Sequence, residues 1–194
     1  MINFLRISPC DSGDGIKLYT ECEGVKNTYT VSAEFFLESG IVKGAASKDI
    51  LYDIKEEEKL YSARRTAIRI LSSGQCSAKR LYEKLRRRGF THECAKNASD
   101  YVLEKGYIDE QWQIESYLKE LVEKKYIGRR KILPMLVAKG YSSDKILSVL
   151  DERYTDDDFK AARQSFLVKK FGKAKPETYE EAEEMKKALY KQGY

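Results

Sequence analysis

The strongest constraint on how this chain folds is a six-residue pattern, Leu-x-x-x-Gly-aromatic, that occurs three times. It reads LRRRGF at 85–90, LVAKGY at 136–141 and LYKQGY at 189–194. The first two glycines are 51 positions apart and the last two are 53 apart. A glycine directly after a helical run is typical of a left-handed C-cap, a conformation in which a side chain would clash. The pattern predicts three copies of one helical unit.

The surroundings of the first two copies also align. Leu81 matches Ile132, and EKGYIDE at 104–110 recurs as ERYTDDD at 152–158. Each unit then holds three helices, of which the second ends at the Gly-aromatic pair. The third copy stops at that pair, so its third helix is missing, and the sequence leaves open whether the natural chain continues past Tyr194.

The predicted fold is mostly α, with tandem three-helix repeats in an elongated curved array after a small N-terminal β segment. Residues 2–8, 16–22 and 27–32 are rich in β-branched and aromatic residues and are predicted to be strands. AEFFLESG at 33–40 predicts a short helix closed by Gly40, and 48–71 has helical spacing. The expected division is 1–54 for the β-rich segment with its short helix, 55–108 for repeat 1, 109–158 for repeat 2 and 159–194 for the incomplete repeat 3.

Two residues in repeat 2 carry separate expectations. Pro134 falls within the second helix, where proline removes a backbone donor and favours a kink. A start near Lys131 instead of Gly128 would move Pro134 into the first turns, and the sequence leaves both starts open. Trp112, on the helix after GYIDE, is expected to be a packing residue and not a stacking platform.

Positive charge is concentrated in one short segment. The whole chain has a net charge of +5, whereas residues 62–90 hold nine basic side chains and one acidic side chain, a net charge of +8. On a helical wheel of 78–88 the apolar residues share one side, and Lys and Arg take most of the remainder. A solvated surface normally mixes both signs, so this segment indicates an anionic partner.

The candidate contact residues are the basic side chains of this segment and their counterparts in the later repeats. For the later repeats, an ordinary solvated surface remains an equal alternative, because nearby acids offset much of the charge. The candidate residues are Arg64, Arg65, Arg69, Lys79, Arg80, Lys84, Arg86, Arg87, Arg88, Arg129, Arg130, Lys131, Lys169 and Lys170.

Enzyme classes find little support in the sequence. It contains no P-loop, no GxGxxG after a strand, no HExxH and no nucleophile elbow, and its single histidine, His92, stands beside a predicted helix cap. The four cysteines form no CxxC pair, so neither a zinc site nor another cofactor is expected. Asp156, Asp157 and Asp158 fit a helix start better than a metal site. We expect a non-enzymatic, monomeric, cytoplasmic protein with reduced thiols, no signal peptide and no membrane span.

The order of these motifs resembles the RecX family of recombinase regulators. The resemblance rests on SAKRLYEKLRRRGF (77–90), YVLEKGYIDE (101–110) and YIGRRKILPMLVAKGY (126–141), with FFLESGIVKG (35–44) similar to the N-terminal β segment of Firmicute-type members. Each motif alone is only modestly specific for the family, but the order and spacing of the motifs together are specific. The chain departs from the family at Gln113 and Ile114, where an aromatic-Ala pair is usual, at Pro134, and in the missing last helix.

The resemblance implies a regulator of the RecA recombinase. Such a protein binds RecA or the RecA–single-stranded DNA filament, with DNA alone as a further possible partner. It restrains ATP hydrolysis, strand exchange and co-protease activity, and so modulates recombination and the SOS response of DNA repair. The sequence leaves open whether RecA or DNA makes the main contact, and whether some contexts bring stimulation instead of inhibition.

The alternative is a transcription regulator of the helix-turn-helix type. It would read bases with the helix at HECAKNASDYVLEK, which contains Asn97. The basic residues lie on the preceding helix, which favours phosphate contacts over base readout.

Overall fold

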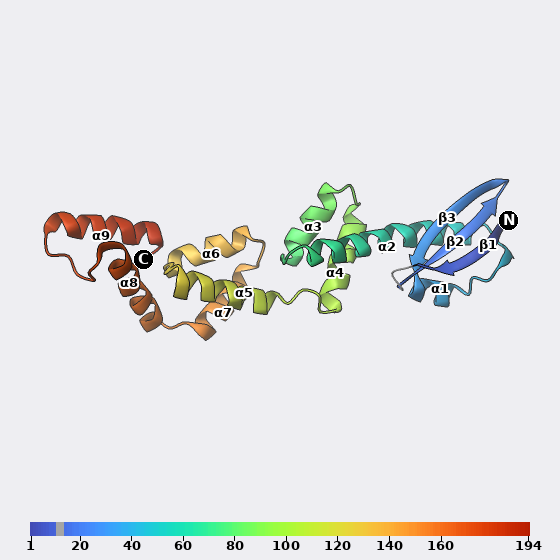
Figure 1. Cartoon of the computed structure of the whole chain (residues 1–194). Coiled ribbons are helices and arrows are strands. Elements are labelled where there is room, and N and C mark those ends of the chain that lie inside the picture. The colour runs from blue at the N-terminus through green and yellow to red at the C-terminus, as the bar shows by residue number, and fades with distance from the viewer. Residues whose placement is uncertain (11–13) are drawn as a thin grey trace. The chain divides into compact units, whose positions relative to one another are not determined.

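Figure 1 shows a computed structural model of the chain, which describes residues 1–10 and 14–194. Small strands come first and helices occupy the rest, so the expected mostly α fold with an N-terminal β segment is confirmed. The described elements are β1 (Ile2–Pro9), β2 (Gly15–Cys22), β3 (Val25–Ser32), α1 (Ala33–Ser39), β4 (Gly44–Ala46), α2 (Ile50–Ser72), α3 (Ala78–Arg87), α4 (His92–Glu104), α5 (Glu110–Lys119), the π-helical η1 (Glu120–Lys124), α6 (Arg129–Ala138), α7 (Ser143–Arg153), α8 (Asp156–Phe171) and α9 (Tyr179–Gln192).

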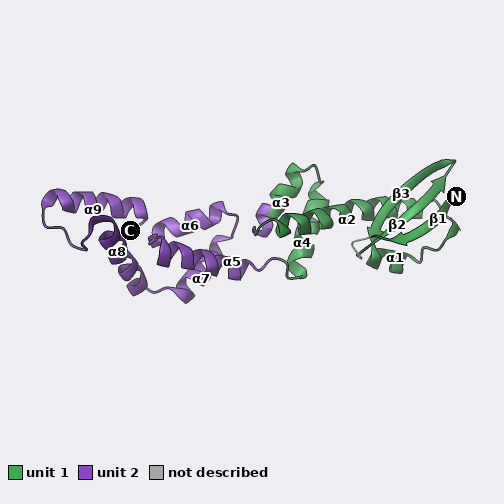
Figure 2. Cartoon of the chain, viewed as in Figure 1, with its two compact units in different colours: residues 1–74, 81–107 green, residues 75–80, 108–194 purple. Residues whose placement is uncertain are grey.

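The chain forms two compact units, coloured separately in Figure 2. Unit 1 comprises 1–74 and 81–107, and unit 2 comprises 75–80 and 108–194. The first turn of α3 is therefore counted with unit 2 and its remainder with unit 1. Two of the borders expected from the sequence, 54/55 and 158/159, fall inside α2 and α8, and the four-part division stays a prediction.

The sheet of unit 1 is antiparallel with the order β3-β2-β1-β4. One side buries Phe4, Leu18 and Val31 against Ile54 of α2, because alternate residues of a strand point to the same face. The three predicted strands are confirmed. The edge strand β4, at 44–46, was not predicted, because three residues of sequence GAA carry no strand signal, and pairing with β1 makes them a strand.

Helices α1 and α2 follow the sheet as expected. The Ser32 hydroxyl accepts a hydrogen bond from the Phe35 N–H at 3.2 Å, and Gly40 ends α1 with φ +62°, which confirms the predicted C-cap. Helix α2 packs along β3 at its beginning and along α4 further on (Figure 1). It thereby joins the sheet to the helices of unit 1.

The three Leu-x-x-x-Gly-aromatic motifs share one geometry. Gly89, Gly140 and Gly193 have φ values of +90°, +94° and +99°. In each motif the N–H of the aromatic residue donates to the carbonyl of the leucine, at 3.3, 3.3 and 3.0 Å in chain order. This bond closes the end of α3, α6 and α9 in the same way, so the C-caps predicted from the glycines are confirmed.

The core of unit 2 lies between α5, η1, α6, α7 and α8. Its fully buried residues include Ile114, Ile132, Leu136 and Ile146. Gln113 is also buried there, and its side-chain oxygen accepts a hydrogen bond from the Tyr141 hydroxyl at 2.7 Å. The departure from the family at Gln113 thus places a polar but hydrogen-bonded side chain in the core.

Within unit 2, helix ends meet head to tail. The Gly128 N–H donates to the Gln192 carbonyl at 2.9 Å and the Arg130 N–H to the Gly193 carbonyl at 3.3 Å, so the start of α6 abuts the end of α9. The Ser77 hydroxyl, just before α3, donates to the Lys139 carbonyl at the end of α6, also at 2.9 Å. These bonds pair backbone groups that helix ends leave unsatisfied, and they place unlike dipole ends together.

Pro134 and Trp112 now have defined positions. Helix α6 begins at Arg129, so Pro134 lies in its second turn, where the residue is exposed. Trp112 is 53% exposed, so the expectation that it is a packing residue was wrong. Helix α5 turns Gln113 and Ile114 toward the core, and Trp112 lies on the opposite side.

The glycine C-caps give a matched pair of variants. Gly89→Ala should lower the free energy of unfolding by about 1–2 kcal/mol, because a side chain is strained in the left-handed region, although its Cβ would meet open space. Gly140→Ala should cost roughly 1–3 kcal/mol more, since its Cβ would lie 2.5 Å from the Ser77 Oγ. Urea unfolding followed by circular dichroism measures both losses, and equal losses would contradict a close contact at Gly140.

Candidate nucleic-acid interface

The end of α3 presents a group of uncompensated cations. Leu81 and Leu85 turn into the core, so the basic residues between and after them face solvent. Lys84, Arg87 and Arg88 are exposed, and none forms an ion pair or side-chain hydrogen bond with the residues that the structure describes. The Arg86 guanidinium donates to the Phe90 carbonyl at 2.6 Å and is also exposed. We call Lys84, Arg86, Arg87 and Arg88 the α3 basic end.

Arg65 and Arg69 lie elsewhere in unit 1, on the exposed side of α2. They line an open cavity of about 500 Å³, together with Thr30, Glu58, Tyr61 and Ser62. The Arg65 guanidinium lies 5.9 Å from the centre of the Tyr61 ring. Glu58 accepts a hydrogen bond from the Thr30 N–H at 3.0 Å, so an acid shares this cavity with the two arginines.

Arg64 is held inside unit 1. Its Nε donates to the Asn97 Oδ1 at 2.9 Å, and its guanidinium lies 5.0 Å from the centre of the Tyr101 ring. A Glu57 carboxylate oxygen lies 4.0 Å away, and only 21% of the Arg64 side chain is exposed. Arg64 therefore joins α2 to α4, and it also occupies the amide oxygen of the one residue proposed for base readout, Asn97.

Arg80 and Lys131 have the same structural role in unit 2. The Arg80 guanidinium hydrogen-bonds the Ala138 carbonyl near the end of α6, and the Lys131 Nζ donates to the Lys191 carbonyl near the end of α9 at 2.9 Å. Both reinforce the head-to-tail contacts of the helices. The sequence carried a signal for this role, because each stands five positions before the leucine of its motif, but charge alone did not reveal it.

The remaining candidates of unit 2 lie against acids or aromatic rings. Arg129 pairs with Asp151, and the Arg130 guanidinium lies 5.4 Å from the Tyr190 ring centre. The Lys169 Nζ lies 5.4 Å from the Tyr126 ring centre, and the Lys170 Nζ lies 5.3 Å from that of Phe171. All four side chains are exposed, as is Lys79. They remain reachable by a ligand, but they are more spread out than the α3 basic end.

The acidic run Asp156–Asp158 forms the first turn of α8. Thr155 and Asp158 form a reciprocal capping box, and the N–H of Thr155 donates to the Asp158 carboxylate at 2.7 Å. Hydrogen bonds from Thr155 hold the pKa of Asp158 below its usual range. The N-cap interpretation of this run is thus confirmed. In the described part of the chain, no three His, Cys, Asp or Glu side chains are grouped as metal ligands would be.

His92 also lies where the sequence placed it, at the start of α4. Its Nδ1 and the Tyr82 hydroxyl are 2.8 Å apart, and the two rings meet edge to face. Among residues 1–10 and 14–194, no helix is both long and apolar enough to cross a membrane.

Comparison with known proteins identifies relatives under one name. Regulatory protein RecX of Clostridium perfringens (strain 13 / Type A) is 26% identical over 172 residues, which cover 86% of this chain and 79% of the relative. Regulatory protein RecX of Caldanaerobacter subterraneus subsp. tengcongensis is 26% identical over 168 residues, which cover 86% of this chain and 82% of the relative. No protein-family model matches the chain.

A solved structure agrees with these relatives. A crystal structure of regulatory protein RecX matches with a TM-score of 0.80 over 100% of this chain and 95% of its own. At 15% identity, this likeness shows the fold alone. The chain is thus similar in sequence to regulatory proteins RecX over most of their length, and it shares the fold of a solved RecX structure.

Proposed function

We propose that this chain regulates the RecA recombinase by binding RecA or the RecA–single-stranded DNA filament. In this proposal it restrains ATP hydrolysis, strand exchange and co-protease activity, and it acts through binding and not through catalysis. Similarity in sequence and fold to regulatory proteins RecX supports the partner. The α3 basic end supports the mode of contact, because it is the group of candidate residues whose charges are least compensated within the described chain.

The α3 basic end suits a polyanionic surface for an electrostatic reason. Phosphate groups of DNA, or acidic side chains of a protein filament, gain from a cation whose charge no internal acid neutralises. The cations also lie at the C-terminal end of a helix, where the helix dipole favours positive charge, so the chain can hold them together without an acid. This observation carries the proposed contact.

The helix-turn-helix alternative has no comparable support. Asn97 is engaged by Arg64, and α4 buries Cys94, Ala95 and Ala98. A helix that reads bases needs free polar side chains on its outer side. We therefore propose sequence-independent contacts, made by a monomer in the cytoplasm, where RecA filaments form.

The central test is the ATPase activity of RecA on single-stranded DNA. Addition of this chain at amounts up to one molecule per RecA should lower the rate of ATP hydrolysis, because a bound regulator restrains the filament. Co-sedimentation with filaments, with RecA alone and with DNA alone would identify the main contact. An unchanged rate at stoichiometric amounts, with no chain in the filament pellet, would refute the proposal.

The α3 basic end can be tested by charge reversal. The triple variant Arg86→Glu, Arg87→Glu, Arg88→Glu should fold normally, since these side chains lie off the buried side of α3, and should bind filaments at least about ten-fold more weakly. Its matched control is Lys26→Glu, Lys43→Glu, Lys96→Glu, which makes the same change in net charge at exposed positions outside the candidate set. Equal weakening by both variants would show a general charge effect, and loss of helical circular dichroism would show that the arginines are structural.

Salt dependence separates these cations from general attraction. Each phosphate contact on single-stranded DNA contributes a slope of about −0.7 to log K against log salt concentration. If three arginines contact phosphates, the slope for the triple-arginine variant should be shallower by about 2. Filament binding measured by anisotropy over a range of salt concentrations gives both slopes, and parallel lines would exclude contact through these arginines.

A further inference from the structure

A second candidate surface lies in unit 2, between α8 and α9. An open cavity of about 560 Å³ there is lined by apolar side chains that include Leu167, Met185 and Leu189, and by Tyr194. Met185 and Leu189 belong to a small cluster with Leu167, to which partly buried Phe166, Phe171 and Tyr194 add. We call this cavity the α8–α9 groove. It lies apart from the α3 basic end along the chain.

The equivalent apolar residues of α6, in the same chain, are covered by the helix α7. Counted from the Leu-x-x-x-Gly-aromatic motif, the groove residues Met185, Leu189 and Tyr194 take the positions of Ile132, Leu136 and Tyr141. Those three residues are in the core of unit 2, where α7 packs against them. Helix α7 contributes apolar residues with spacing i, i+3 and i+4: Ile146, Val149 and Leu150. An amphipathic helix is thus the shape that this arrangement accommodates elsewhere in the same chain.

The hydroxyl group of Tyr194 points to a polar feature of the occupant. It is buried and has no hydrogen-bond partner among the described residues, whereas the equivalent hydroxyl, on Tyr141, donates to Gln113. Burial raises the pKa of Tyr194 to about 12, so the group is a protonated donor at neutral pH. An occupant that supplies a hydrogen-bond acceptor would satisfy it.

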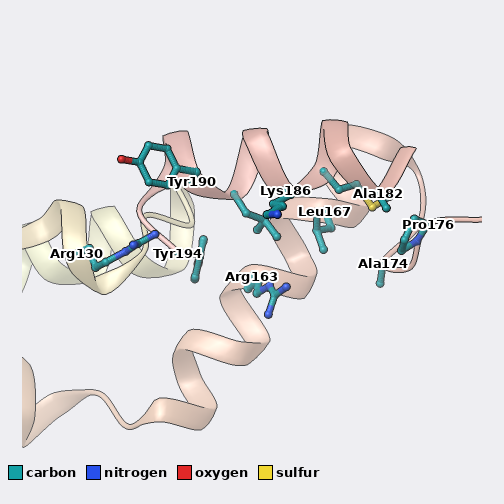
Figure 3. Close-up of a pocket in the computed structure, with 11 residues that line it drawn as sticks. Arg130, Arg163, Leu167, Ala174, Pro176, Ala182, Lys186, Tyr190 and Tyr194 are labelled. Atoms are coloured by element: carbon teal, nitrogen blue, oxygen red, sulfur yellow. The ribbon is translucent and has the colours of Figure 1, made fainter. Parts of the chain in front are cut away.

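The charges around the groove are mainly positive. Figure 3 shows Arg130 of α6, Arg163 of α8 and Lys186 of α9 around it. Arg163 is exposed and forms no ion pair with the described part of the chain. Lys186 lies 3.8 Å from a Glu183 carboxylate oxygen, and this pair is exposed. An apolar floor with a cationic rim is complementary to an apolar segment with carboxylates at its edges.

We propose that the α8–α9 groove binds an amphipathic helix of a protein partner, with apolar residues at i, i+3 and i+4 and flanking carboxylates. The apolar residues pack on Met185 and Leu189 as α7 packs on Ile132 and Leu136. The carboxylates pair with Arg163 and Lys186, and one of them accepts the hydrogen bond of Tyr194. This proposal does not depend on the proposed regulation of RecA, and it assigns the groove to protein and not to nucleic acid.

The test uses a peptide built on α7. The probe is a fluorescently labelled, acetylated and amidated peptide of residues 142–153 that carries Lys145→Glu and Arg153→Glu. A control peptide also carries Ile146→Ala, Val149→Ala and Leu150→Ala, which removes the apolar side and keeps the charge. Anisotropy with the full chain should show saturable binding of the probe and at least about ten-fold weaker binding of the control. Absence of binding, or equal binding of both peptides, would overturn the proposal.

Variants of the chain locate the binding. Arg163→Glu with Lys186→Glu should weaken probe binding about ten-fold, because two favourable charge pairs become repulsive. Lys187→Glu is the control, since Lys187 is an exposed neighbour on α9 that does not line the groove. This substitution changes the net charge by half as much as the double variant does, so the two effects are compared per unit of charge. An effect of Lys187→Glu per charge as large as that of the double variant would refute a site in the groove. Displacement of the probe by oligo(dT) but not by excess unlabelled peptide would assign the groove to nucleic acid instead.

Two tyrosine variants test the hydroxyl separately from folding. Tyr141→Phe should lower the melting temperature, because it leaves Gln113 without its buried partner. Tyr194→Phe should leave the melting temperature unchanged or raise it, since its hydroxyl has no hydrogen-bond partner among the described residues to lose. The same substitution should weaken probe binding about three- to ten-fold. Equal drops in melting temperature would mean that the Tyr194 hydroxyl is already satisfied, and unchanged probe binding by Tyr194→Phe would remove it from the site.

Discussion

The structure depends on how the backbone groups at the ends of α3, α6 and α9 are satisfied. In α3, α6 and α9 the aromatic N–H bonds back to the leucine carbonyl across a left-handed glycine, so each helix ends at a defined residue and its leucine is held in the core. In unit 2 a carbonyl of that turn then accepts a hydrogen bond from the start of another helix, as Gly193 of the α9 turn does from Arg130 of α6. A side chain at the glycine would disturb both the turn and this contact. The motif is therefore at once a helix terminator and a docking surface.

The same contacts divide the basic residues into two groups. Arg80 and Lys131 place their charged groups on backbone carbonyls at the ends of α6 and α9, and Arg64 ties α2 to α4. Arg87 and Arg88 lie within the first motif, in unit 1, and form no ion pair or side-chain hydrogen bond with the described residues. A cation already bound to protein oxygens must lose that interaction before it binds a phosphate, whereas a free one does not. The proposed filament contact therefore rests on the α3 basic end.

Much of the fold could be predicted because its signals are local. A glycine after a helical run, the acidic run 156–158 at the start of α8, and the β-branched and aromatic residues of β1 to β3 each act within a few neighbouring residues. The strand β4 escaped prediction because the sequence GAA has no strand preference, and its structure comes from pairing with β1. The prediction that Trp112 packs in the core was wrong because it relied on the average tendency of aromatic residues to be buried. The side of α5 that faces the core is instead decided by Gln113, Ile114 and Leu118 together.

The sequence by itself determined the repeating motif, the helix ends and the segment in which positive charge accumulates, since all three depend on residues close together in the chain. Only the tertiary structure decided which cations are available, because the partners of Arg80 and Lys131 lie 58 and 60 positions away. It also decided that Tyr141 is buried in the core of unit 2, while Tyr194, at the same position of its motif, borders an open groove. Identical local patterns gain different roles when the neighbours that satisfy their polar groups, or cover their apolar ones, come from distant segments.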